Sequence, residues 1–420
     1  MVVDIVRIGG GLARAAVFSA LLLPAAAAAQ TAAPVPNPPP VTVGWNDGFF
    51  IQSPDGANRL LIGFVLQTDG RFALDEPPPF SDTFVLRKVR PTFSGRVARF
   101  VEFRVMPELA GGSATLLDGY VDLRFTESFR IRGGKEKTPV GYELLIGDAS
   151  LLFPERSVVS QLVPNRDVGF SAQGEAAAGR IVYAGGIYNG NALDGGNTPN
   201  DIDTNSGKDL AGRIVVLPFR TSGTPPSHWN NVGFHLGGSV GDETGALPSL
   251  RTTGGQTYFA YAATTADGRR TRITPAAFAY VGPFGGFAEY ARSTSEVLHA
   301  GAPFTVANDA WSVNASYVLT GESTSERGVR PRAPFEPGAG HWGAVQLVVR
   351  YAEIAVDDEV FSAGLATPDS SRKTTQLTFG ANWYLTHYIK IYGTYERFAF
   401  GGPSELPNEN SITVRLQLAF

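Results

Sequence analysis

Large apolar residues and small or polar residues alternate along most of the chain after residue 45. The alternation is clearest at the C-terminus, where Ile412, Val414, Leu416, Leu418 and Phe420 occupy every second position. A period of two predicts a β-strand with one apolar face and one polar face.

Two further segments, Val97–Leu109 and Leu117–Phe125, show the same period. Their large apolar residues fall on one face of each predicted strand, and their charged residues fall on the other. The charged faces carry Glu102, Arg104 and Glu108 in the first segment and Asp118, Asp122 and Arg124 in the second.

Such strands fit either a soluble sandwich or a membrane barrel whose apolar faces meet lipid. Aromatic residues lie at strand ends, and the last strand runs to the terminal Phe420. Short turns such as Gly282–Pro283 alternate with long polar connections such as Glu322–Gly340. We therefore predict an all-β fold, a transmembrane antiparallel β-barrel of about 16 strands (range 16–18) around an aqueous lumen.

The first residues have the features of an export signal. Arg7 and Arg14 are basic, Ala15–Leu23 is apolar, and small residues precede Gln30. The apolar run is shorter than the ~20 residues of a membrane-spanning helix. We expect a cleaved signal peptide over 1–29, a proline-rich tether over 30–44 and the barrel over 45–420.

Composition excludes several classes of function. The chain has no cysteine, which removes disulfides and thiolate chemistry, and its net charge of −4 argues against a nucleic-acid-binding protein. The five histidines show no metal-ligand spacing. We expect no metal site, no cofactor and no catalytic residue.

Several segments, in this order along the chain, resemble the phosphate-selective porin O and P family of Gram-negative outer membranes. They are Phe84–Arg104, Gly134–Glu143, Phe153–Ser157, Arg166–Gly169, Tyr188–Gly190, Gly282–Gly285, Tyr317–Glu322 and Gly380–Leu385. The resemblance spans roughly residues 45–420. It implies a homotrimer of 16-stranded barrels, each an anion-preferring pore. A proline-rich tether stands where the family often has a helical segment.

If the apolar faces look outward, a set of charged residues points into the lumen. The basic members are Lys88, Arg90, Arg96, Arg104, Arg124, Arg130 and Arg132, and the acidic members are Glu102, Glu108, Asp118, Asp122 and Glu136. A slip of one residue would reverse any of these faces. The arginines either attract anions or pair with the acids across strands, and the sequence leaves both interpretations open.

Lys135 and Lys137 follow this set, either in an exposed turn or beside a loop that folds into the lumen. We expect that loop over Leu144–Pro164, an apolar stretch without clean alternation that contains Glu155 and Arg156. Lys135 and Lys137 therefore join the seven basic residues above as candidate substrate-binding residues that line the pore.

The leading hypothesis is passive diffusion of small anions, with phosphate or polyphosphate as the expected substrates. One alternative is a structural or adhesive barrel with a plugged lumen and partner-binding loops. Another is an outer-membrane enzyme, for which His387 is the one candidate residue. The expected partners are outer-membrane lipid and lipopolysaccharide, small anions and two further copies of the chain, with no nucleic acid.

Overall fold

The computed structural model describes residues 41–190, 205–221 and 228–420. The expected signal peptide and residues 30–40 of the expected tether lie outside these ranges. Among the described residues, neither α-helix has the length and apolar character needed to cross a membrane.

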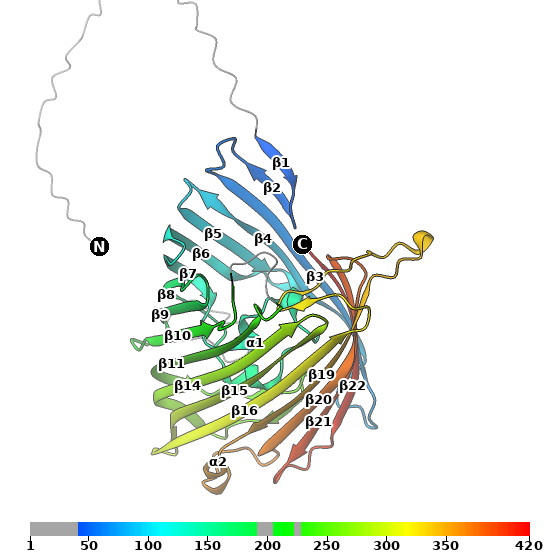
Figure 1. The fold of residues 1–420 in the computed structure, drawn as a ribbon. Helices are drawn as coiled ribbons and strands as arrows, with labels where there is room; N and C mark the ends of the chain where they lie inside the picture. The colour runs from blue at the N-terminus through cyan, green and yellow to red at the C-terminus, as the bar shows by residue number, and fades with distance from the viewer. Residues whose placement is uncertain (1–40, 191–204, 222–227) are drawn as a thin grey trace, which may run out of the picture. The chain divides into compact units, whose positions relative to one another are not determined.

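Sixteen strands form a closed antiparallel barrel, as the alternation predicted (Figure 1). The last strand, β22, closes the barrel by pairing with β3, with Leu418 opposite Leu66 and Ser411 opposite Ala73. The barrel strands are β3 (Arg59–Ala73), β4 (Thr83–Val97), β5 (Val101–Glu108), β6 (Thr115–Thr126), β7 (Phe129–Lys137), β8 (Arg166–Ala176), β9 (Ile181–Tyr188), β10 (Asp209–Val216), β11 (Val232–Ala246), β14 (Thr264–Val281), β15 (Phe284–His299), β16 (Ala302–Val318), β19 (Ala344–Ala355), β20 (Lys373–Tyr384), β21 (Ile389–Gly401) and β22 (Glu409–Ala419).

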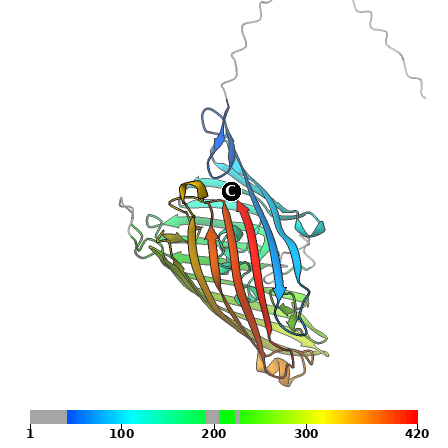
Figure 2. The same ribbon diagram turned by 90° about the vertical axis from the view of Figure 1, so that its right-hand side faces the viewer.

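A short hairpin precedes the barrel. It consists of β1 (Thr42–Trp45) and β2 (Phe49–Gln52), so regular structure begins inside the segment expected to be a tether. Strand β2 pairs with the start of β3 at Arg59–Ile62, while β22 pairs with the later part of the same strand. The hairpin therefore extends the sheet beyond the C-terminus (Figure 2).

The two ends of the barrel differ in their connections. One end, here called the terminus end, carries the hairpin, the C-terminus and several turns of two to four residues. It also carries two longer connections, 217–231 and 319–343. The second contains β17 (Thr324–Ser325), β18 (Gly328–Val329) and the 3₁₀ helix η4 (Pro337–Ala339). The opposite end, here called the loop end, carries most of the longer connections, including β12 (Leu250–Arg251), β13 (Thr257–Phe259) and α2 (Asp358–Ser362).

The alternation predicted the faces of β22 correctly, since Leu416 is 54 % exposed and Arg415 is fully buried. The predicted strand Val97–Leu109 is in fact interrupted, because Ala98 and Arg99 form a turn with positive φ and β5 starts only at Val101. Leu117, predicted on the outward face, is buried. It lies in a β-bulge, since Met106 pairs with Asp118 while Pro107, which has no N–H, pairs with Leu116.

Residues 138–165, which join β7 to β8, fold into the lumen as predicted and are here called the constriction loop. The loop contains α1 (Tyr142–Leu145), η2 (Asp148–Ser150) and η3 (Val158–Leu162). Buried residues of η3 pack in one apolar cluster with inward-facing alanines of β15, β16 and β19, namely Ala291, Ala310 and Ala352. These small side chains leave room for the loop, so the loop fills the lumen beside β14–β16 and β19–β21.

Candidate functional site: the lumen beside the constriction loop

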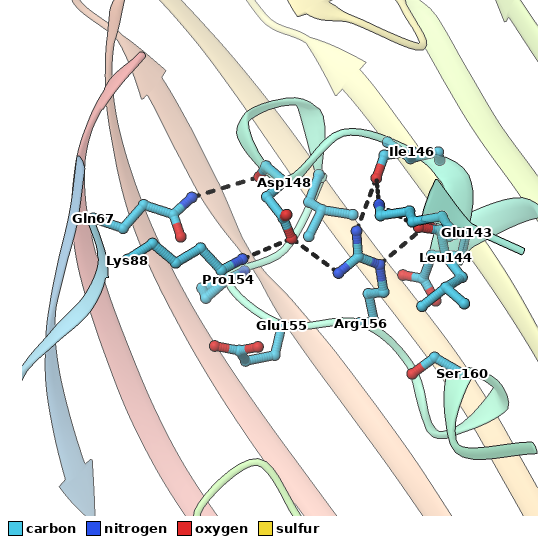
Figure 3. A network of polar contacts seen from close by, with 12 residues as sticks. Gln67, Lys88, Glu143, Leu144, Ile146, Asp148, Pro154, Glu155, Arg156 and Ser160 are labelled. Carbon is cyan, nitrogen blue, oxygen red and sulfur yellow. Dashed lines mark hydrogen bonds and ion pairs between the residues drawn. The ribbon is translucent and has the colours of Figure 1, made fainter. Parts of the chain in front are cut away.

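The constriction loop turns its charged side toward β4, and Asp148 is the first centre of charge there. Its carboxylate accepts from Lys88 Nζ at 2.7 Å and from Arg156 Nη1 at 2.9 Å, and it also pairs with Arg90. Lys88 and Arg156 approach it from opposite sides (Figure 3). Burial favours the neutral acid, but these cations outweigh burial and hold the pKa of Asp148 well below its ordinary value.

Glu155 is the second centre of charge. Its Oε1 lies 2.6 Å from Arg87 Nε, 2.9 Å from Arg415 Nη2 and 3.1 Å from Arg71 Nη2. Burial opposes ionisation here too, but the neighbouring cations, with Arg87 and Arg415 first among them, keep the pKa of Glu155 well below its ordinary value. Asp148 and Glu155 are therefore both ionised and surrounded by cations.

A β-bulge in β4 brings Arg87 to this site. Gln67 of β3 pairs with Lys88, but the next residue, Thr68, pairs with Leu86, so Arg87 is an extra residue in β4. A bulge lets two successive side chains reach the same face. Arg87 and Lys88 both contact the constriction loop as a result, one at Glu155 and the other at Asp148.

Two cavities lie along the charged side of the loop. The loop-end cavity has a volume of about 470 Å³, and the next cavity toward the terminus end, here called the middle cavity, has about 410 Å³. Both are lined by Arg90, Asp148 and Arg166, so they adjoin there. A third cavity, of about 870 Å³, lies at the terminus end around the β17–β18 hairpin and shares Arg213 with the middle cavity.

The first two cavities are strongly basic although the whole chain has a net charge of −4. Twelve basic residues line them, namely Arg71, Arg87, Lys88, Arg90, Arg104, Arg130, Arg132, Lys137, Arg156, Arg166, Arg213 and Arg251. Four acidic residues do so, namely Asp118, Glu136, Asp148 and Glu155. The electric field in this part of the lumen is therefore that of an excess of fixed positive charge.

Five of the nine predicted residues line the two cavities from within β4, β5 and β7. Besides Lys88 and Arg90 these are Arg104, Arg130 and Arg132. The guanidinium of Arg132 bonds to Asp122 at 2.6 Å and lies 3.6 Å from the centre of the Tyr120 ring. Pairing with acids, the second interpretation of the sequence, therefore takes place alongside the basic excess.

The other four predicted residues have different surroundings. Arg96 donates to the Gly56 carbonyl at 3.0 Å and Arg124 pairs with Glu102 at 3.1 Å, and neither lines the two cavities. Lys137, the last residue of β7, borders the middle cavity but donates to the loop carbonyls of Leu144 at 2.6 Å and Ile146 at 3.1 Å. Lys135 is buried and lines neither of the two cavities, so its role as a pore-lining residue stays a prediction.

The sequence reasoning missed several basic residues of these cavities, including Arg71, Arg166, Arg213 and Arg251. A signal existed for Arg71, because it shares a strand face with Gln67 and Asp69, just as Arg415 shares one with Thr413 and Gln417. His387 lies at the terminus end, with Nε2 3.7 Å from the Asp47 carboxylate. Within the described ranges, no three His, Asp or Glu side chains are grouped so as to hold a metal ion.

Comparison with known proteins places this chain in a family. The model of the family described as phosphate-selective porin O and P matches residues 75–420. No curated protein sequence matches the chain.

Several solved structures share the fold. The outer membrane channel DcaP of Acinetobacter baumannii has a TM-score of 0.56 at 9 % identity, over 89 % of this chain and 99 % of DcaP. OmpF of Salmonella typhi, in complex with daunomycin, has 0.53 at 10 % identity, over 90 % of this chain and all of OmpF. The trimer form of Vibrio cholerae OmpT, folded in vitro, has 0.52 at 12 % identity, over 87 % of this chain and all of OmpT.

Proposed function

The chain belongs to the phosphate-selective porin O and P family and is an outer-membrane channel, and we propose that this channel admits small anions, phosphate among them, in preference to cations. Family and fold point to a channel rather than an enzyme. Passage is passive, so the lumen has only to select ions and let them leave.

The basic excess along the open side of the constriction loop carries the proposal. An anion that enters meets guanidinium groups, which present planar pairs of N–H donors matched to carboxylate and phosphate oxygens. The acids of the lumen hold part of this charge in ion pairs, as Asp148 does for Lys88 and Arg90. Binding therefore stays weak enough for the anion to move on, which conduction requires.

The alternative of a plugged, adhesive barrel fits the lumen less well. The constriction loop fills only one side, and cavities of about 470 and 410 Å³ adjoin on the other. For the assembly we propose a homotrimer, since the OmpT relative in fold is solved as a trimer. The exposed apolar residues of the strands, such as Phe170 and Leu416, would meet membrane lipid and, in the outer leaflet, lipopolysaccharide.

The test is single-channel recording of the purified protein in a planar bilayer under a potassium chloride gradient. We expect a reversal potential of the sign that anion preference gives, and added phosphate should reduce the chloride current. Arg90→Gln should lower the ratio of anion to cation permeability roughly fivefold, the equivalent of about 1 kcal/mol for one lumenal charge.

The matched control is Arg292→Gln, which removes a half-exposed arginine that pairs with Asp309 and lines neither cavity. Its permeability ratio should equal that of the wild type. A cation-selective wild-type channel would contradict the proposed function.

A further inference from the structure

The third cavity, at the terminus end and here called the terminus-end cavity, differs from the other two in its walls. Toward the loop end, the inward residues of β3 are polar, namely Gln67, Asp69 and Arg71. The next inward position toward the terminus end is Val65, which lines the terminus-end cavity. Along β20, Asn382 is likewise followed by Tyr384, which also lines it. The inward rows of both strands therefore lose polarity at this end.

The constriction loop and the β17–β18 hairpin supply further apolar side chains. Leu145 and Ile146, where α1 ends, line the terminus-end cavity from the loop. Val329 of β18 lines it from the hairpin and packs in one apolar cluster with Tyr384. Aliphatic and aromatic side chains from four separate segments thus surround one space. The interior of a water-filled barrel is ordinarily polar, so this wall requires an explanation.

A hydrophobic gate that closes by expelling water does not explain the wall. Such a gate needs a narrow constriction, whereas this cavity, at about 870 Å³, is the largest of the three. Sites for small organic molecules have volumes of roughly 300–1,000 Å³, walls that are mainly apolar and a few charged groups that fix the ligand. The terminus-end cavity therefore has the size and the walls of a site for a molecule with a carbon skeleton.

A buried arginine lies where this cavity adjoins the middle cavity. Arg213 of β10 lines both cavities, as do Val65 and Leu145. Among the residues that the structure describes, the buried Nε of Arg213 has no hydrogen-bond partner. An anion that leaves the middle cavity therefore meets an unsatisfied cationic donor and an apolar surface at the same place.

The remaining charges of the cavity also favour an anion. Within the described ranges, its lysine and arginine side chains outnumber its acidic side chains four to two, with Arg213, Arg327, Arg330 and Lys390 against Asp47 and Glu326. Asp47 is paired with Arg330 at 2.7 Å. A ligand that complements these walls has one anionic end and one apolar end.

We propose that the terminus-end cavity is a binding site for organic anions that carry an apolar group, aromatic carboxylates in particular, on their way through the channel. The ring lies against Val65, Leu145 and Tyr384, since aromatic rings pack favourably with one another, and the carboxylate faces Arg213. This rests on the proposed function, because the ligand must first pass the basic part of the lumen. The basic lumen then selects for negative charge, and the terminus-end cavity selects among anions for an apolar part.

The experiment compares benzoate with acetate as blockers of the chloride current at pH 7, where both carboxylates are ionised. Benzoate should block the wild type at a concentration about tenfold lower than acetate, the factor that burial of about 60 Å² of apolar surface supplies. Val65→Thr combined with Leu145→Asn removes apolar wall with little change in size and should reduce this difference to about threefold. Arg213→Gln should weaken block by both anions alike and leave their ratio unchanged.

The matched control is Val313→Thr combined with Leu319→Asn, which makes the same changes at exposed positions that line none of the three cavities. Its ratio of benzoate to acetate block should equal that of the wild type. Wild-type crystals soaked in 4-iodobenzoate should show anomalous density between Leu145 and Tyr384, a result that does not depend on the folding of any variant.

Three results would overturn the proposal. They are equal block by benzoate and acetate in the wild type, an unchanged ratio in the folded variant of Val65 and Leu145, and the absence of iodine from the cavity. The wild-type reversal potential in potassium chloride involves neither organic anion, so it reports separately on whether the channel prefers anions.

Discussion

The two sides of the lumen are built from different inward-facing residues. On β15, β16 and β19 the inward positions include Ala291, Ala310 and Ala352, and all three are fully buried under the constriction loop. On β4–β7 they are mainly charged side chains, several of which line the two cavities.

The contrast shows how one loop can both narrow a pore and contribute charged side chains to its lining. Small inward residues make a recess into which the apolar side of the loop packs as a core does. The opposite side of the loop, with Asp148 and Glu155, then faces the basic wall across the remaining space. The alanines therefore determine the position of the open channel, and the arginines determine which ions pass through it.

The largest effect on conductance is expected from a charge introduced into the packed side of the lumen, where η3 packs against β15, β16 and β19. Val159 is fully buried in the apolar cluster of η3, and Val159→Asp would bury an unpaired carboxylate there, at a cost of at least ~2 kcal/mol. The loop should leave its recess, and the single-channel conductance should roughly double, since a 16-stranded barrel without an infolded loop leaves a wide channel. Anion preference should fall as the loop charges move away.

Gln161→Ala is the control for this variant. Gln161 belongs to the same 3₁₀ helix but is partly exposed and bonds to the backbone of Arg251. Its conductance should match the wild type. Heat-modifiable migration in gels should show that both variants retain the barrel, and a folded Val159→Asp channel with unchanged conductance would contradict the role given to the recess.

A smaller effect, on anion preference, is expected when the pH is lowered from 7 to 4. Because the pKa values of Asp148 and Glu155 lie well below the ordinary range, both stay ionised, and their ion pairs persist, as the pH falls from 7 to 4. Burial raises the pKa of Glu326, in the 319–343 segment, so this acid loses its charge before Asp148 and Glu155 do. Anion preference should therefore rise only slightly toward pH 4.

Glu326→Gln should remove that slight rise, because Glu326 lines the terminus-end cavity and is the group held responsible for it. Reversal potentials at the two pH values provide the measurement. A steep increase in anion preference that persists in Glu326→Gln would contradict the assignment of the pH effect to Glu326.

The barrel could be predicted from the sequence because its signal is local. Alternation in Ile412–Phe420 needs no knowledge of partners, and the inward face of a regular strand follows from it. The lumenal positions of Arg104, Arg130 and Arg132 follow from the same alternation in their own strands. The infolded loop was also recognisable, since Leu144–Pro164 is apolar without a strand period.

The rest depends on contacts between distant segments. The bulges at Arg87 and Leu117 shift which residues face inward, and each arises from pairing with another strand. The carboxylates of the loop meet their cations only because η3 docks on the far wall. The grouping of Arg71, Arg87 and Arg415 needs the barrel to close between β22 and β3, which no local pattern reveals.

The most direct test of where the channel runs uses the absence of native cysteine. Thr92→Cys would place one thiol in the middle cavity, and Ser312→Cys would place one on the packed side, where Ser312 is 1 % exposed. An anionic methanethiosulfonate, added during bilayer recording, should reduce the current of Thr92→Cys and leave that of Ser312→Cys unchanged. Block of Ser312→Cys with no effect on Thr92→Cys would contradict a channel between the constriction loop and the basic wall.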